Sequence, residues 1–167
     1  VIRRIDAATG IISRFAGVGK PECVSFQDGG RPNGDGGPAL NAVFFQPIAL
    51  ATDSQGNLFI ADTSDGKVRR IDAATNIVTT VAGNGSLEDN ISGDGGPATR
   101  AALGGVVDIV VDAQGNLLIA SRANVRRVDA RTGIITTIAG NGKELGDGRS
   151  IKDGDPATQV AISPVSI

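Results

Sequence analysis

Residues 53–61 read D-S-Q-G-N-L-F-I-A, and residues 112–120 read D-A-Q-G-N-L-L-I-A. The two copies are 59 residues apart, and the same spacing separates Pro38 from Pro97 and Pro97 from Pro156. A fixed period of several tens of residues is typical of repeat architectures, in which each copy is one structural unit. The repeat is therefore the feature from which the fold is predicted.

Each unit contains short apolar runs separated by turn residues, which is the pattern of strands and not of helices. In the middle copy the expected strands are residues 48–52, 58–61, 68–71 and 77–81. Their connections are rich in Gly, Asn, Asp and Ser, so consecutive strands should form an antiparallel meander. The first two strands are apolar on both faces, which predicts that both faces are covered. Radial stacking of such four-stranded sheets predicts an all-β protein of the β-propeller class.

Four phrases of this unit resemble the long bacterial variety of NHL repeat. They are G-N-L-F-I-A-D, V-R-R-I-D-A-A-T, T-T-V-A-G-N-G and S-G-D-G-G-P-A-T-R-A-A-L. The resemblance covers nearly the whole chain and implies propeller blades, in a family common in large secreted and cell-surface proteins. NHL propellers serve as protein-binding, RNA-binding and sugar-associated platforms, and some are lyases. The resemblance therefore implies a fold without settling a function.

The repeat divides the chain into one array of blades. Residues 1–16 match the second half of a blade, residues 47–83 and 106–140 match full blades, and residues 164–167 match the first strand of another. Closed propellers have roughly four to eight blades. We therefore expect either a segment of a longer polypeptide or a chain that assembles with copies of itself, and the absence of methionine fits a segment. A three-plus-three homodimer is the less tidy alternative, because the last unit lacks its second strand.

Composition excludes several classes of function. The net charge of −2 and the pI of about 5.0 give no general attraction to nucleic acid or to anionic membranes, and no apolar run is long enough to insert into one. The chain has no histidine, which removes histidine-dependent triads and zinc sites, and with them the histidine-liganded metal of NHL-type lyases. Cys23 lies in a Gly-rich loop with no visible base. We therefore predict no catalytic residue and no cofactor in this chain.

Acidic Gly-rich loops are the candidate metal site. Asp35, Asp94 and Asp155 stand among glycines in the three loops, and carboxylates in such a setting bind Ca²⁺ in other proteins. The preferred alternative is a structural turn, in which the Asp bonds to turn amides and Pro97 opens one helical turn over residues 98–103.

The remaining repeated residues are expected to be structural. Arg-Arg pairs recur at residues 3–4, 69–70 and 126–127, and neighbouring strand residues point to opposite faces, so no pair forms one patch. We expect these arginines to clamp acidic groups such as Asp72 or Asp129, or loop carbonyls, between blades. The residues predicted to carry the repeat are Arg4, Arg70, Arg127, Asp53, Asp112, Gly56, Gly115, Pro38, Pro97 and Pro156.

Three functions remain open from the sequence. The first is a non-enzymatic extracellular or cell-envelope scaffold that binds a protein or a glycan or assembles with itself, since long loops on a rigid array are where binding resides. The second is one wall of a propeller enzyme whose catalytic residues lie outside these residues. The third is nucleic-acid binding, which would require arginines to converge on one exposed face.

Overall fold

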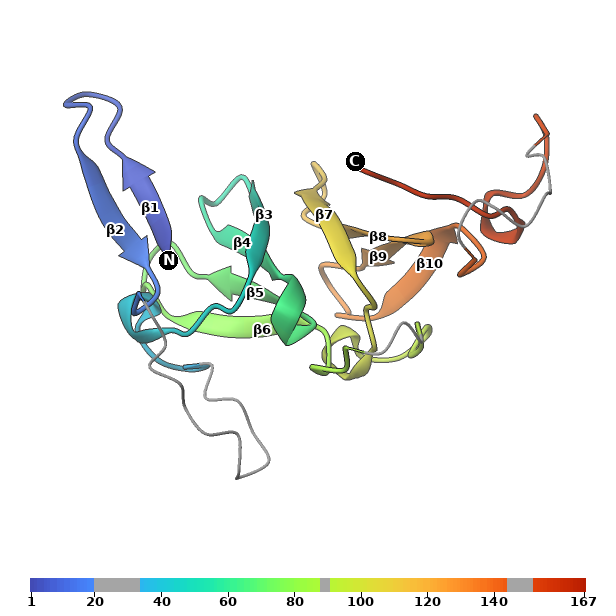
Figure 1. The fold of residues 1–167 in the computed structure, drawn as a ribbon, viewed down its shortest axis with the longest axis horizontal. Helices are drawn as coiled ribbons and strands as arrows, with labels where there is room; N and C mark the ends of the chain where they lie inside the picture. Colours follow the sequence, from blue (N-terminus) through green and yellow to red (C-terminus); the bar gives the residue numbers. More distant parts are fainter. Residues whose placement is uncertain (20–33, 88–90, 144–151) are drawn as a thin grey trace.

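The computed structural model describes residues 1–19, 34–87, 91–143 and 152–167, and its strands form three antiparallel sheets side by side (Figure 1). The first sheet contains β1 (Ile2–Ile5) and β2 (Ile12–Ala16). The second contains β3 (Pro47–Thr52), β4 (Leu58–Asp62), β5 (Lys67–Ile71) and β6 (Val78–Ala82). The third contains β7 (Val106–Val111), β8 (Leu117–Ser121), β9 (Asn124–Val128) and β10 (Ile135–Ala139).

Both four-stranded sheets are up-and-down meanders. Neighbouring strands in each sheet are consecutive in the sequence, and every pairing is antiparallel. The turn between the first two strands contains Gly56 in the second sheet and Gly115 in the third, each with a φ of +82°. This left-handed conformation is accessible to glycine without the steric cost of a side chain. The predicted all-β architecture of four-stranded propeller blades is therefore confirmed.

Two apolar clusters hold the three sheets together. Phe59 and Leu117 belong to the cluster between the second and third sheets, which also includes residues of β3 and β7. Ile2 and Ile60 belong to the cluster between the first and second sheets. Each sheet therefore buries apolar side chains against a neighbouring copy, because a single small sheet cannot remove enough apolar surface from water alone.

The first strand of the second sheet is not covered on both faces, contrary to the expectation from its apolar composition. Ile48 and Leu50 of β3 are 45% and 51% exposed, whereas residues 59–62 of β4 are buried. β3 is an edge strand, and its main contact with a neighbouring sheet is with β7. Burial on both faces begins at the second strand.

Residues 164–167, predicted as the first strand of a further blade, form no strand ladder. A strand requires a hydrogen-bonded neighbour, and no strand of the described residues pairs with this segment. The backbone N–H of Ile167 instead donates to Oδ2 of Asp108 on β7 at 3.0 Å. The C-terminal segment therefore returns toward the third sheet (Figure 1).

A Gly-rich loop precedes each four-stranded sheet and ends in a proline followed by a short 3-10 helix. The loops at residues 34–38 and 93–97, called edge-capping loops below, lead into η1 (Ala39–Asn41) and η3 (Ala98–Arg100). A third copy at residues 152–156 leads into η4 (Ala157–Gln159), while η2 (Thr63–Asp65) joins β4 to β5. The helical turn expected after Pro97 is thus present in a shorter, 3-10 form.

Each edge-capping loop covers the outermost strand of the sheet that follows it. The backbone of residues 36–37 exchanges two hydrogen bonds with Val78 of β6, at 2.8 and 3.0 Å. One repeat later, residues 95–96 make the same exchange with Ile135 of β10, at 2.8 and 3.1 Å. An uncovered outer strand offers unpaired backbone groups to other chains. The loops therefore close an edge that would otherwise be open.

Candidate functional site

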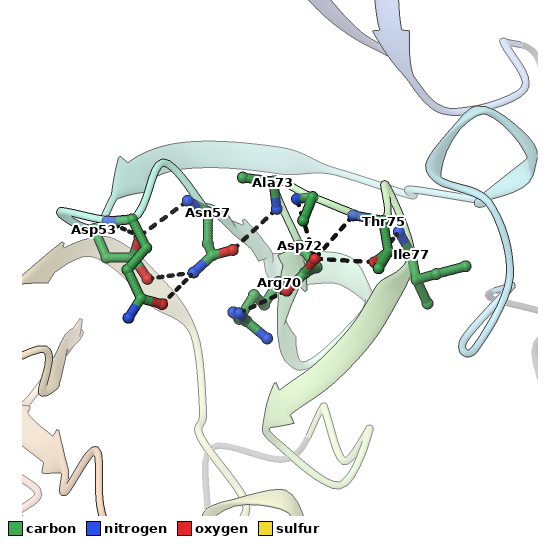
Figure 2. A network of polar contacts seen from close by, with 9 residues as sticks. Asp53, Asn57, Arg70, Asp72, Ala73, Thr75 and Ile77 are labelled. Atoms are coloured by element: carbon green, nitrogen blue, oxygen red, sulfur yellow. Dashed lines mark hydrogen bonds and ion pairs between the residues drawn. The ribbon is translucent and has the colours of Figure 1, made fainter.

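A polar network joins two turns at one end of each four-stranded sheet. In the second sheet, Asp53 Oδ1 accepts hydrogen bonds from the backbone of Gln55 at 3.0 Å and of Asn57 at 2.9 Å (Figure 2). The side-chain amide of Asn57 donates to Asp53 Oδ2 at 2.7 Å and accepts from the backbone N–H of Ala73 at 2.9 Å. Asn57 is buried, so its side chain fixes the β3–β4 turn to the β5–β6 turn.

The third sheet repeats this network. Asn116 donates to Asp112 Oδ2 at 2.8 Å and accepts from the backbone of Ala130 at 3.0 Å. Sequence reasoning identified Asp53 and Asp112 as structural residues of the repeat but missed the bridge made by the asparagine. The signal was the recurrence of Asn in both copies of Q-G-N.

A second carboxylate of each four-stranded sheet lies in the turn between its third and fourth strands and binds one arginine of that sheet's pair. Asp72 Oδ1 accepts from the backbone and the hydroxyl of Thr75, at 3.0 and 2.9 Å, and these bonds hold the pKa of Asp72 below its ordinary value. Arg70 forms an ion pair with Asp72 at 3.0 Å, and Arg127 pairs with Asp129 at 3.4 Å. The expected partners Asp72 and Asp129 are confirmed, but each ion pair lies within one hairpin and does not join two blades. The reason is that the two residues face the same side of one strand, two positions apart.

Arg4, the counterpart in the first sheet, contacts an aromatic ring. Its guanidinium carbon lies 5.6 Å from the ring centroid of Phe15 on β2. This is the range of a cation–π contact at a largely exposed position.

In the second and third sheets, the other arginine of the pair binds an edge-capping loop. Arg126 is fully buried, and its Nε and Nη2 donate to Asp94 Oδ1 at 3.0 and 2.5 Å. Arg126 also donates to the carbonyls of Ala102 and Ser92, at 3.0 and 3.1 Å. Burial opposes ionisation of Asp94, but hydrogen bonds from Thr137 and Arg126 outweigh it and lower the pKa of Asp94. The ion pair therefore fixes the loop to the blade.

The second sheet contains the same arrangement. Arg69 is fully buried and donates to Asp35 Oδ1 from Nε at 3.0 Å and from Nη2 at 2.5 Å. Asp35 Oδ2 accepts from the hydroxyl of Thr80 at 2.6 Å. The ring of Phe44 lies 5.8 Å from the guanidinium carbon of Arg69.

The structure does not bring the calcium candidates together. Asp35 and Asp94 each bind an arginine and a β-strand threonine. Asp155 accepts from the backbone N–H of Lys152 at 3.1 Å. By distance from the following proline, Asp153 and not Asp155 is the counterpart of Asp94. Within the described ranges, no three His, Cys, Asp or Glu side chains gather as a metal site, and Cys23 lies outside those ranges.

Asp62, the last residue of β4, is a buried carboxylate. It accepts hydrogen bonds from the backbone of Phe45 at 2.9 Å and of Gln46 at 2.6 Å. Burial raises its pKa more than these bonds lower it. In the third sheet Ser121 replaces it and donates to the carbonyl of Leu103 at 2.8 Å. No periodic signal marks this position, because its residue type changes between copies.

A cleft of about 530 Å³ opens between the second and third sheets, beside the polar network. Its apolar lining includes the buried side chains of Phe59, Leu117 and Val128. Its polar lining includes Arg70 and the exposed side chain of Gln114. A cleft of this volume that combines buried apolar side chains with fixed polar groups is typical of ligand sites. The cleft is therefore the candidate binding site of the chain.

Asp53 and Asp129 also line this cleft, and both are committed to hydrogen bonds. Burial opposes ionisation of Asp53, but the bonds from Asn57 and Gln55 leave its pKa lowered. The hydroxyl and backbone of Thr132 lower the pKa of Asp129. Both carboxylates are therefore ionised at neutral pH and act as fixed acceptors at the rim.

The structure gives no helix in its described portion that is long and apolar enough to cross a membrane.

Comparisons with known proteins place the chain beside much longer proteins. No family model matches the sequence. A stretch of 103 residues is 36% identical to Teneurin-3 of Danio rerio, and the match covers 55% of this chain but 4% of that protein. A crystal structure of a structural-genomics protein of unknown function from Bacteroides thetaiotaomicron VPI-5482 matches with a TM-score of 0.50 and 28% identity, over 67% of this chain and 25% of the other. The chain is thus similar to a small part of a teneurin and to a quarter of a bacterial protein.

Proposed function

We propose that this chain belongs to a non-enzymatic β-propeller scaffold of the NHL type, located outside the cell or in the cell envelope. The scaffold would bind a protein or a glycan, or assemble with itself. The observation that carries the binding role is the cleft between the second and third sheets, with buried apolar side chains below and fixed polar groups at its rim. The NHL assignment and the location rest on the sequence phrases that resemble that family.

The chemistry of the cleft suits recognition. Asp53 and Asp129 are held as hydrogen-bonded acceptors, and Arg70 and Gln114 supply donors beside an apolar floor. Acceptors and donors fixed over an apolar surface match sugar hydroxyls or peptide groups. A carboxylate with a lowered pKa is a poor general acid or base near neutral pH, which supports binding over catalysis.

The arginines support a scaffold over a nucleic-acid partner. Arg69 and Arg126 are fully buried, and each forms an ion pair with a loop carboxylate. Arg70 and Arg127 are paired with carboxylates of their own hairpins. Nucleic-acid binding draws on exposed, clustered positive charge, which these four side chains do not provide.

The test is a binding screen with a matched pair of variants. Panels of oligosaccharides and short peptides would be titrated against the chain, with backbone amide NMR shifts as the readout. Arg70→Ala removes a residue that lines the cleft, whereas Arg127→Ala removes its repeat counterpart, which does not line it. We expect the first to weaken binding by about tenfold or more and the second to leave it unchanged. Failure of every probe, or equal effects of both variants, would contradict the proposal.

A further inference from the structure

The first residue of the third strand differs between the two four-stranded sheets. It is Lys67 in β5 and Asn124 in β9, and each pairs with the last residue of the preceding strand. In the second sheet, η2 places the buried carboxylate of Asp65 at 3.1 Å from the ammonium of Lys67. The corresponding turn of the third sheet consists of residues 122–123 and contains no carboxylate. The third sheet therefore lacks both the long cationic side chain and its anionic partner.

The space that the Lys67 side chain fills in the second sheet is open in the third. A Cβ on Gly85, in the loop after β6, would lie 3.4 Å from Cε and 3.5 Å from Nζ of Lys67. Gly142 is the counterpart of Gly85 in the second copy of A-G-N-G, and a Cβ on Gly142 meets nothing within 4 Å. Gly142 and Asn124 line a pocket of about 450 Å³. The shorter side chain of the third sheet therefore leaves room for a ligand group.

Asn124 gives this pocket a buried polar group without a partner. The residue is 2% exposed, and its Oδ1 accepts no hydrogen bond from the part of the chain that the structure describes. The buried asparagines Asn57 and Asn116 instead use both their side-chain nitrogen and their side-chain oxygen in hydrogen bonds. A buried acceptor without a donor destabilises the folded state, so a ligand that donates to it gains free energy on binding.

The charged groups of the pocket favour a cationic donor. Asp94 lines the pocket with a carboxylate whose side chain is 47% exposed, and Thr137 lies beside it. Arg126 also lines the pocket, but its Nε, Nη1 and Nη2 donate to Asp94 and to two backbone carbonyls. The positive charge of Arg126 is thus balanced by Asp94, and its nitrogens are engaged. A carboxylate forms stronger hydrogen bonds with a charged donor than with a neutral one.

We propose that this pocket, called the Asn124 pocket below, binds a primary ammonium group on an alkyl chain, in the place that Lys67 occupies in the second sheet. An ammonium has three N–H donors, which suit the oxygen of Asn124 and the carboxylate of Asp94. The alkyl chain lies over Gly142, as the Lys67 chain lies over Gly85. The group comes either from a lysine side chain of a partner protein or from a free amine. The Asn124 pocket shares no lining residue with the cleft between the second and third sheets, so this inference goes beyond the proposed function.

Titration with n-butylamine at neutral pH tests the chemistry of the ligand, because an alkyl amine is protonated there, as a lysine side chain is. Backbone amide NMR signals of Asn124 and Gly142 should shift on binding. The neutral analogue 1-butanol should bind at least about tenfold more weakly, because it lacks the charge. No shift with n-butylamine, or equal binding of the two probes, would overturn the proposal.

Two substitutions of Asn124 test the position of the ligand. Asn124→Lys restores the residue of the second sheet, so its own ammonium should fill the pocket and weaken n-butylamine binding by about tenfold or more. Thr99→Lys is the matched control, because it adds the same charge at an exposed residue of η3 that does not line the pocket, and it should bind like the wild type. Asn124→Ala keeps the space but removes the acceptor and should weaken binding by about threefold or more. Unchanged binding in both Asn124 variants, with circular dichroism to verify their folding, would contradict the assignment.

A short peptide with one central lysine and blocked termini distinguishes the two sources of the ammonium group. Tighter binding of this peptide than of n-butylamine would support a lysine of a partner protein, whereas equal or weaker binding would support a free amine. Failure of both probes would overturn the site. If both fail while the cleft still binds its own probe, only this inference is lost and the scaffold function stands.

Discussion

Asp94 lies in the loop before the third sheet, yet its carboxylate is bound by Arg126 of β9, 32 residues later in the chain. The guanidinium is fully buried, and the side chain of Asp94 is 47% exposed. The contact therefore connects a loop to the strand whose neighbour it covers, and it makes the loop part of the blade.

Loss of this carboxylate should destabilise the fold. Asp94→Asn leaves a buried guanidinium without its anion, which costs about 3–5 kcal/mol at a fully buried site. Partial exposure of Asp94 and the two carbonyls that also bind Arg126 reduce the expected loss to about 2 kcal/mol. Urea unfolding followed by circular dichroism gives the value. Asp153→Asn removes an exposed loop carboxylate and should change the free energy of unfolding by less than about 0.5 kcal/mol; equal losses in the two variants would contradict the pairing of Asp94 with Arg126.

Loss of the Asn57 side chain should reduce the free energy of unfolding more than loss of the nearby Gln55 side chain. Asn57→Ala removes a buried amide that binds Asp53 and the backbone of Ala73, so we expect a loss of about 1–3 kcal/mol in unfolding free energy. Gln55→Ala alters the same turn but removes only a long contact of 3.4 Å and should cost less than about 0.5 kcal/mol. Thermal unfolding of both variants compares them directly. Equal melting temperatures for Asn57→Ala and Gln55→Ala would show that the asparagine bridge does not stabilise the fold.

The stability of the chain should depend on pH through Asp62. Burial raises the pKa of Asp62 above its ordinary value of 3.8, so the folded state holds the proton more tightly than the unfolded state. The free energy of unfolding should therefore rise as pH falls from above the raised pKa toward 3.8. Asp62→Asn should lack this rise, and urea unfolding at a series of pH values measures it. A rise of the same size in the variant would assign it to another group.

At lower pH, the free energy of unfolding should depend on the carboxylates whose pKa values are lowered by folding. Asp72 and Asp94 have lowered pKa values, so their contribution is present above the ordinary value of 3.8 and is lost as pH falls through their folded values. Below 3.8, both the wild type and Asp62→Asn should lose stability in parallel.

Two glycines of one edge-capping loop should differ in how much their substitution by alanine destabilises the fold. Gly93 and Gly95 have φ values of +92° and +79°, so alanine at either position carries a strain of about 1–2 kcal/mol. A Cβ on Gly93 would lie 2.7 Å from Cα of Ala101, whereas a Cβ on Gly95 meets nothing within 4 Å. Gly93→Ala should therefore lose about 1–3 kcal/mol more than Gly95→Ala. Equal unfolding free energies would show that the close approach to Ala101 is relieved at no cost.

The blades could be predicted from the sequence because each strand and turn is determined by residues close together in the chain. The Q-G-N turns recur 59 residues apart, the apolar runs recur around them in each copy, and each run and turn determines its own strand or hairpin. The partner of each arginine could not be predicted from the sequence, because Arg69 and Arg70 are adjacent residues of the same type. Pleating sends one of them to the edge-capping loop and the other to its own hairpin, and that choice depends on where the loop lies.

Two further features depend on tertiary context. Ile48 and Leu50 have the composition of a strand covered on both faces, but an edge strand is covered only where a neighbour lies against it. Asp62 and Ser121 occupy the same place with different hydrogen bonds, so comparison of the copies did not identify a buried charge.

Because each edge-capping loop precedes the sheet that it covers, a blade moved into another repeat protein must be moved together with the loop before it. Residues 93–97 belong by contact to the sheet that ends at β10, although they precede its first strand by several residues. A splice placed immediately before β7 would graft a sheet without its cover and leave Arg126 facing a foreign loop. A splice near residue 85 would transfer the loop, the ion pair and all four strands together. The segment that would fold as one unit after transfer therefore begins with the edge-capping loop, before the first strand of the blade.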